Sequence, residues 1–173
     1  MKKIMLGVVL MLSIVKYDPV DGQVSDNVLK SFSQQYPQGS IRKWVVKNDT
    51  CVAEFTMSRS KNMAYYLADG NWIKTETKIP WTKDLPKAVN LSWKYSDFAS
   101  WYVAGIKEVK YPDKDLYVLK VQHDCGPEGS IPGDCLNIYK LYFDPDGSLI
   151  KKVHMGDNLK GSYTNGFFKK CCP

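Results

Sequence analysis

Histidine is scarce in this chain of 173 residues, which contains only His123 and His154. Neither histidine lies in a nucleophile motif, and no pair of carboxylates stands in a pattern typical of acid–base catalysis. A catalytic acid or base must lie within hydrogen-bonding reach of the group that it serves, so a lone histidine on a strand is weak evidence for catalysis. The sequence therefore predicts a protein that is not an enzyme and has no catalytic residues and no cofactor.

A long apolar run is also missing, because the run from Ile4 to Val15 is too short to span a bilayer. Lys2 and Lys3 precede this run, which is the layout of a secretory signal peptide. We predict that residues 1–22 form a signal peptide cleaved after Gly22, and that no part of the mature protein enters the membrane. A short leader that begins with lysines is typical of bacteria, so we expect the protein in the periplasm or outside the cell.

No block of like charges stands out, although the formal net charge is +6. Lysine and arginine alternate with aspartate and glutamate along most of the predicted strands, which is typical of solvated faces. A nucleic-acid site would instead concentrate positive charge in a patch or stripe. We therefore expect no nucleic-acid partner.

Five cysteines in an exported chain indicate disulfide bonds, with one cysteine left over. Cys125 and Cys135 enclose a loop rich in glycine and proline, and we predict a disulfide between them. A metal site built from His123, Cys125 and Cys135 is the alternative, but an oxidising compartment favours the disulfide, so we predict no metal. Cys51 has Cys171 or Cys172 as a further possible partner, and the sequence does not decide between them.

A pattern of nine residues occurs twice, at positions 65–73 and 142–150, which are 77 positions apart. Each copy has an aromatic pair, two spacers, Asp, Gly, one spacer, a bulky apolar residue and Ile. Asp-Gly between apolar runs predicts a hairpin with a type I′ turn, in which both central residues have positive φ. The constant offset predicts that a small module is duplicated.

The predicted elements extend this duplication upstream. Ser25 or Asp26 can cap a helix that carries Val28 and Phe32, and a second helix carries Val89 and Trp93 with the same spacing. The fold class that follows is α+β, with two tandem helix-plus-four-strand antiparallel modules at 23–80 and 81–155 and a tail at 156–173. The predicted strands are Ile41 to Lys47, Cys51 to Met57, Asn62 to Ala68, Asn71 to Ile79, Ile106 to Tyr111, Leu116 to Gln122, Leu136 to Phe143 and Leu149 to His154.

Three segments of the chain resemble a known family: Asp69 to Ile73, Leu85 to Val89, and Tyr142 to Ile150. Over about residues 25–155 the chain resembles the PepSY-like, beta-lactamase-inhibitor-protein-like (BLIP-like) exported proteins of gut bacteria. The resemblance implies two tandem modules whose sheets can join into one concave surface with the helices behind it. It implies no catalytic residues, and it does not carry over inhibition of beta-lactamase.

A sheet with helices on one side leaves its other face open, and strand alternation predicts which residues lie there. We expect Tyr65, Trp72, Tyr142 and Lys140 on this open face, with Lys74 and Glu76 on the same face as Trp72. Tyr66 and Phe143 should point inward. Aromatic side chains among charged ones are typical of protein-binding surfaces. Cross-strand pairing within the sheet would explain the same aromatic residues without a partner.

The sequence thus favours a non-enzymatic exported binding module that presents an open sheet face to a protein or peptide. The alternatives are an inhibitor of a secreted peptidase or other hydrolase, a structural or stress protein of the envelope, and a small hydrolase that uses His154 or His123.

Overall fold

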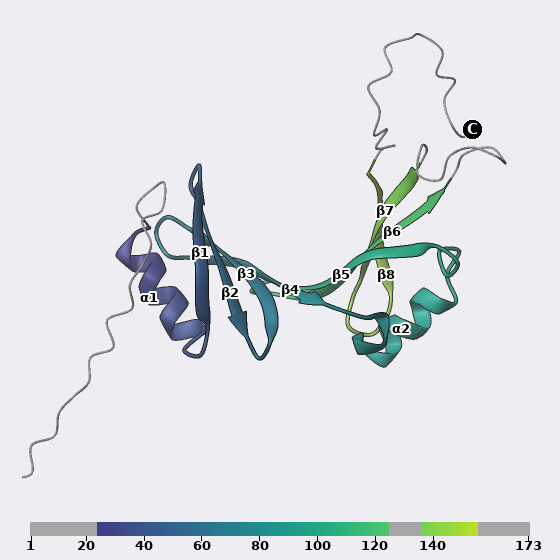
Figure 1. The fold of residues 1–173 in the computed structure, drawn as a ribbon, viewed down its shortest axis with the longest axis horizontal. Helices are drawn as coiled ribbons and strands as arrows, with labels where there is room; N and C mark the ends of the chain where they lie inside the picture. The colour runs from purple at the N-terminus through teal and green to yellow at the C-terminus, as the bar shows by residue number, and fades with distance from the viewer. Residues whose placement is uncertain (1–23, 125–135, 156–173) are drawn as a thin grey trace, which may run out of the picture.

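The structure is a computed structural model that describes residues 24–124 and 136–155 (Figure 1). Its described elements follow one another as two α-helices, eight strands and one short 3-10 helix. They are α1 (Asp26–Gln35), β1 (Ser40–Lys47), β2 (Thr50–Met57), β3 (Ser60–Leu67), β4 (Trp72–Ile79), η1 (Thr82–Asp84), α2 (Lys87–Lys94), β5 (Tyr102–Lys110), β6 (Asp115–Asp124), β7 (Leu136–Phe143) and β8 (Leu149–His154).

The predicted α+β fold of two helix-plus-four-strand modules is wrong. The eight strands form one antiparallel sheet in the order β1 to β8, and with only two α-helices in the described residues the fold is mostly β. β4 pairs with β5 from Thr75 opposite Lys110 to Ile79 opposite Ile106. An unpaired edge strand exposes a row of N–H and C=O groups, and this pairing removes two such edges from the middle of the molecule.

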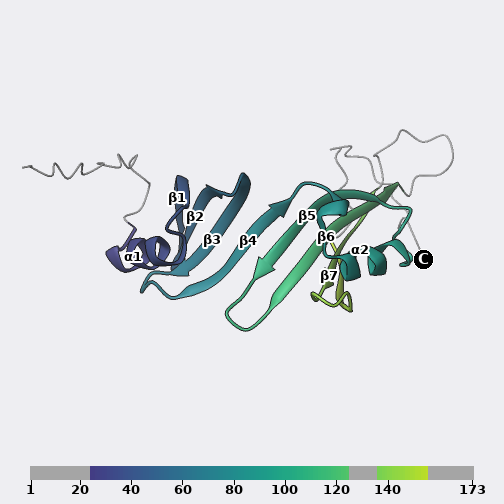
Figure 2. The ribbon, with the colours of Figure 1, turned by 90° about the horizontal axis from the view of Figure 1, so that it is seen from below.

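Both helices lie on the same face of the sheet. Val28 and Phe32 of α1 are buried against β2 and β3, whereas Val89 of α2 is buried against β5, β6 and β7. On β4, Thr75 lies opposite Ala64 of the first core cluster and Ile79 opposite Ile106 of the second. Residues four apart on a strand share a face, so the sheet has one helix-covered face and one face without a helix. Figure 2 shows the helices at the two ends of the molecule.

Helix α1 begins as the sequence predicts, because the Ser25 hydroxyl accepts a hydrogen bond from the Val28 backbone N–H.

The predicted type I′ turns are wrong. Only Gly70 and Gly147 have positive φ in the two repeated turns, at 94° and 92°, whereas a type I′ turn would need it at the aspartates as well. Gly70 N–H donates to the Leu67 carbonyl and Leu67 N–H to the Asn71 carbonyl, which describes a three-residue turn ending in a left-handed glycine.

The two repeated turns dock on the two helices. A Cβ atom at Gly70 would lie 2.9 Å from the carbonyl oxygen of Asn27 in α1, and one at Gly147 would lie 2.8 Å from the backbone of Ala88 in α2. Glycine is required at both positions, since no other residue combines positive φ with the absence of a Cβ atom. The duplicated pattern therefore marks where each hairpin contacts a helix.

Several predicted features lie outside the described residues. These are the signal peptide at 1–22, the disulfide between Cys125 and Cys135, and the tail at 156–173. Among the described helices, none has the length and apolar character needed to cross a membrane.

Candidate binding surface on the open sheet face

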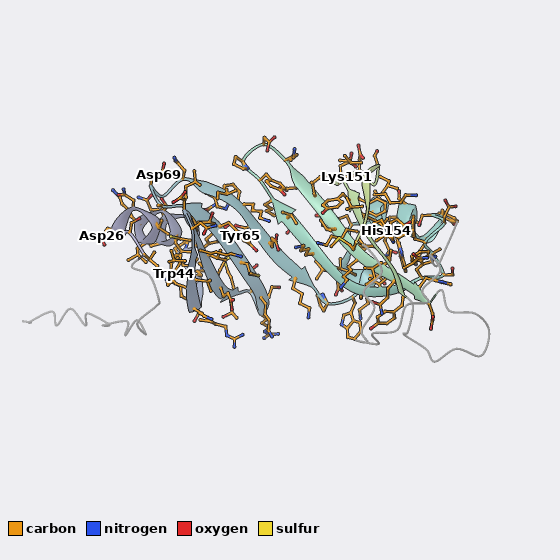
Figure 3. The ribbon with its side chains drawn as sticks, turned by 90° about the horizontal axis from the view of Figure 1, so that it is seen from above. Asp26, Trp44, Tyr65, Asp69, Lys151 and His154 are labelled. Carbon is orange, nitrogen blue, oxygen red and sulfur yellow. The ribbon has the colours of Figure 1, made fainter. Side chains whose placement is uncertain are left out.

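The open face is the face of the sheet opposite the two helices, α1 and α2. Tyr65 and Tyr142 lie on it, because their chain neighbours Tyr66 and Phe143 belong to the two core clusters on the other side. Lys140 lies beside Tyr142 on the same face, directly opposite Lys120. Figure 3 labels Tyr65 on the N-terminal half of the sheet and Lys151, the residue opposite Tyr142, on the other half. The roles of these residues in binding stay predictions.

Trp72 is not on the open face, so the prediction for this residue is wrong. Tyr65 of β3 pairs with Lys74 of β4, but Tyr66 pairs with Trp72, so the register shifts by one residue in a β-bulge. Trp72 therefore lies on the same face as Tyr66. The indole packs against the core cluster beneath α1, and its Nε1–H donates to the Thr75 hydroxyl at 2.9 Å. A bulge inserts one residue and reverses the alternation of faces beyond it.

A carboxylate with two lysine partners lies near the middle of the open face. Glu76 on β4 accepts a hydrogen bond from Lys74 Nζ at 2.6 Å through Oε1 and from Lys107 Nζ of β5 at 2.7 Å through Oε2. The Lys74 ammonium also lies 4.4 Å from the centre of the Tyr65 ring, within range of a cation–π interaction. This cluster joins β3, β4 and β5 and so crosses the strand pair that unites the two halves.

The ionisation of this cluster is set by burial and by its internal hydrogen bonds. Burial raises the pKa of Glu76, but the hydrogen bonds from Lys107 and Lys74 outweigh it, so the net pKa is lowered. For Lys74, burial acts to lower the pKa, and the hydrogen bond and charge of Glu76 reverse this so that the pKa is raised. The pKa of Tyr65 is raised, first by burial and then by the charge of Glu76. All three shifts favour a carboxylate between two ammonium groups and a neutral tyrosine.

The open face is hollowed around this cluster. A cavity of about 470 Å³ extends over residues from β1 to β7, including Met63 and Val118 on its floor. Its charged lining consists of six basic residues and two acidic ones: Arg42, Lys61, Lys78, Lys107, Lys120, Lys140, Glu54 and Glu76. The sequence predicted charges of both signs dispersed over solvated faces, whereas folding gathers an excess of positive charge in one hollow.

The two histidines do not line this hollow. They lie near the C-terminal ends of β6 and β8, and each packs against an aromatic ring. The His123 ring lies 5.2 Å from the Trp101 ring, and the His154 ring lies 4.8 Å from the Tyr139 ring. Over residues 24–124 and 136–155, no three His, Cys, Asp or Glu side chains are grouped in a way that could hold a metal ion. Cys51 is a buried free thiol, and burial raises its pKa.

Strand alternation predicted Tyr65, Tyr142, Lys140 and Glu76 on the open face, but it did not identify Lys107, Lys120 or the ion pairs of Glu76. The alternation Lys74, Thr75, Glu76, Thr77, Lys78 was a usable signal, since it places three charged side chains on one face of a strand. The pairing of Glu76 with Lys107 could not be found this way, because the two residues meet only through the β4–β5 register.

No family model matches this chain, and no curated protein matches it. Solved structures do resemble it. A BLIP-like protein from Bacteroides fragilis NCTC 9343 is 24% identical, with a TM-score of 0.65 over 86% of this chain and 94% of that one. A DUF2874 family protein from Bacteroides ovatus ATCC 8483 is 23% identical, with a TM-score of 0.66 over 77% of this chain and 89% of that one.

A third solved structure is that of a protein from Bacteroides eggerthii DSM 20697 predicted to be periplasmic, which is 20% identical with a TM-score of 0.64 over 77% of this chain and 90% of that one. These descriptions support the BLIP-like part of the resemblance, while the PepSY-like part stays a prediction. At these identities the likeness establishes the fold alone. The chain therefore shares its fold with a BLIP-like protein and with DUF2874 proteins of Bacteroides.

Proposed function

We propose that this chain is an exported, non-enzymatic binding module that presents its open sheet face to a protein or peptide partner. The observation that carries the proposal is the hollow of about 470 Å³, which spans seven strands on the side of the sheet opposite both helices. Met63 lines this hollow, and Tyr65 and Tyr142 lie on the same face of the sheet. Tyrosine and methionine are enriched in protein interfaces. The signal peptide predicted at residues 1–22 and the fold shared with a protein predicted to be periplasmic support export to the periplasm or beyond.

The proposal is tested by affinity capture from envelope and secreted fractions. The bait is the protein itself, beside a Tyr65→Ala/Tyr142→Ala variant that retains cooperative unfolding. We expect a partner held by the wild type and lost from this variant. The matched control is Trp81→Ala/Tyr95→Ala, which removes two aromatics that are 65% and 88% exposed but lie outside the strands of the open face. Capture that is equal for all three proteins would contradict binding through this face.

Inhibition of a secreted hydrolase is the second candidate, favoured by the fold shared with a BLIP-like protein. In that case the open face would cover the active site of the target enzyme. Titration of the protein into assays of secreted peptidases and other hydrolases should then lower their rates in the wild type but not in the Tyr65→Ala/Tyr142→Ala variant. An unchanged rate across these assays would leave the binding module without an inhibitory role.

A further inference from the structure

We propose that the partner of the open face is an extended protein segment rich in carboxylates, in which acidic residues flank apolar ones. This inference rests on the proposed function and adds the chemistry of the partner. Its first support is the imbalance of charge in the hollow, where six basic residues face two acidic ones.

Most of these cations have no counter-ion within the part of the chain that the structure describes. Glu76 is already held by Lys74 and Lys107, and no described carboxylate lies within 4.0 Å of the other five basic groups. These are Arg42, Lys61, Lys78, Lys120 and Lys140. An incoming carboxylate would therefore meet ammonium and guanidinium groups that do not have to abandon an existing ion pair.

Two pairs of lysines stand directly opposite each other on neighbouring strands. Lys78 of β4 faces Lys107 of β5, and Lys120 of β6 faces Lys140 of β7. Like charges directly opposite each other destabilise a sheet. The arrangement therefore works against the stability of the free protein, and a bound anion between the paired lysines would relieve the repulsion.

The row of residues across the sheet indicates what lies between the acidic groups of the partner. The register places Lys107 opposite Val118, Val118 opposite Tyr142, and Tyr142 opposite Lys151. Cations thus stand at both ends of this row, although Lys107 is shared with Glu76, and the centre holds the buried Val118 and the Tyr142 ring. With strands about 4.8 Å apart, the row from β5 to β8 is about 14 Å long, which about four residues of an extended peptide would span.

The same residues favour an acidic peptide over a nucleic acid. Five of the six cations in the hollow are lysines, whereas arginine is the residue that binds phosphate in a bidentate manner. Glu54 and Glu76 both lie opposite Met63, so they are on the same face and would repel a continuous phosphate backbone. Met63, which is 36% exposed, offers an apolar contact that the side chains of a peptide can use.

The test measures the affinity of the protein for a synthetic peptide with glutamates on both sides of a central leucine and tyrosine, by fluorescence anisotropy at low and at physiological salt. We expect binding that weakens as salt increases. A matched peptide with glutamine in place of every glutamate should bind at least about tenfold more weakly. A single-stranded oligothymidylate labelled in the same way is the nucleic-acid probe.

The variant Lys120→Gln/Lys140→Gln should weaken binding of the glutamate peptide about tenfold. Its matched control is Lys30→Gln/Lys94→Gln, which removes the same charge from exposed positions on α1 and α2 and should change the affinity less than about twofold. Since the first variant relieves a repulsion, its unfolding in urea should be at least as resistant as that of the wild type.

Each other outcome overturns the inference. Equal affinity for the glutamate and glutamine peptides, with loss in Tyr65→Ala/Tyr142→Ala, would leave the open face as a binding site without acidic specificity. Equal losses in the two lysine variants would show that net charge alone attracts the peptide. Tighter binding of the oligothymidylate would identify a nucleic-acid site. If the glutamate peptide does not bind, the acidic partner is rejected. The proposed function fails separately, if the affinity capture is the same for the wild type and the Tyr65→Ala/Tyr142→Ala variant.

Discussion

The N-terminal and C-terminal halves of the sheet hold their helices in the same way but fill the space beneath them differently. In both halves a left-handed glycine of a hairpin turn contacts helix backbone, through Gly70 on α1 and Gly147 on α2. Beneath α1 the core is aromatic, with the Phe32 ring 5.6 Å from Trp44 and 5.0 Å from Phe55. Beneath α2 the fully buried side chains are mostly aliphatic, namely Val89, Leu119, Val121 and Leu141 with Phe143, and the rings of Phe98, Trp101 and Tyr139 pack together beside them.

The contact between turn and helix is thus the same in both halves, whereas the side chains that fill the core differ. Only glycine fits the two turns, because the residue there has positive φ and a Cβ atom would lie less than 3 Å from helix backbone. A core can be filled by many combinations of apolar side chains, provided that volume and shape are retained. The repeated pattern in the sequence therefore reports how a turn docks on a helix, and it carries no information about a ligand.

The largest expected effect comes from opening a cavity in the aromatic core. Phe55→Ala should lower the free energy of unfolding by about 3–5 kcal/mol, since Phe55 is 1% exposed and contacts the Phe32 and Tyr36 rings. Because β4 and β5 join the halves in one sheet, amides of β2 and β7 should lose protection from hydrogen exchange at the same urea concentration. Separate transitions for these two strands would mean that the halves unfold independently. Leu141→Ala, made in the other core, should shift both strands together as well.

The two repeated glycines provide the second comparison. Gly70→Ala and Gly147→Ala should each destabilise the protein by about 1–3 kcal/mol, because each combines backbone strain with a contact to a helix. Gly105→Ala is the control, since a Cβ atom there would meet nothing within 4 Å. Urea unfolding of the three variants measures these effects. A cost at Gly105 as large as at the two turns would refute the docking explanation.

The central ion cluster gives a smaller and pH-dependent effect. The pKa of Glu76 is lower in the folded protein than its ordinary value, so its stabilising contribution is present above the ordinary carboxyl range and is lost as pH falls through the lowered pKa. At pH 7, Glu76→Gln should lower the free energy of unfolding by about 1 kcal/mol, and the difference from wild type should shrink in acid.

Urea unfolding of wild type and Glu76→Gln at neutral and acidic pH measures this difference. Asp113→Asn is the matched control, because the Asp113 carboxylate is 73% exposed and lies 3.9 Å from its lysine partner. A Glu76→Gln effect that stays constant from neutral to acidic pH would mean that the charge of Glu76 does not stabilise the sheet.

The smallest expected effect distinguishes the two opposed lysine pairs. Lys120→Gln should stabilise the free protein by about 0.5 kcal/mol, because it removes the repulsion from Lys140. Lys78→Gln should stabilise it less, since Glu76 already neutralises Lys107 on the opposite strand. Thermal unfolding at low salt compares the two variants, and the gain at Lys120 should decline as salt is added. A larger gain at Lys78 would show that Glu76 does not shield its neighbours.

The positions of the helices and strands could be predicted closely from the sequence. Ser25 caps α1 as expected, and β1 to β8 agree with the predicted strands to within a few residues at each end. These features follow from local rules, namely capping, alternation of side chains and turn residues. The placement of Tyr65, Tyr142 and Lys140 on one face could be predicted for the same reason.

The fold class and the centre of the open face could not be predicted in this way. Trp72 lies on the helix side because of one bulge, and a single inserted residue leaves no clear mark in the sequence pattern. Glu76 finds Lys107 only because β4 pairs with β5, a contact between residues that are 31 positions apart. No local preference specifies which edges of a sheet will meet.

The sequence by itself thus determined the approximate positions of the strands and which way Tyr65 and Tyr142 point, because those properties depend on a few neighbouring residues. Tertiary structure alone decided that eight strands form one sheet, that Trp72 turns inward, and that dispersed lysines gather around Glu76. The physical reason is that strand pairing and register are set by the burial of both faces and the satisfaction of edge hydrogen bonds over the whole sheet.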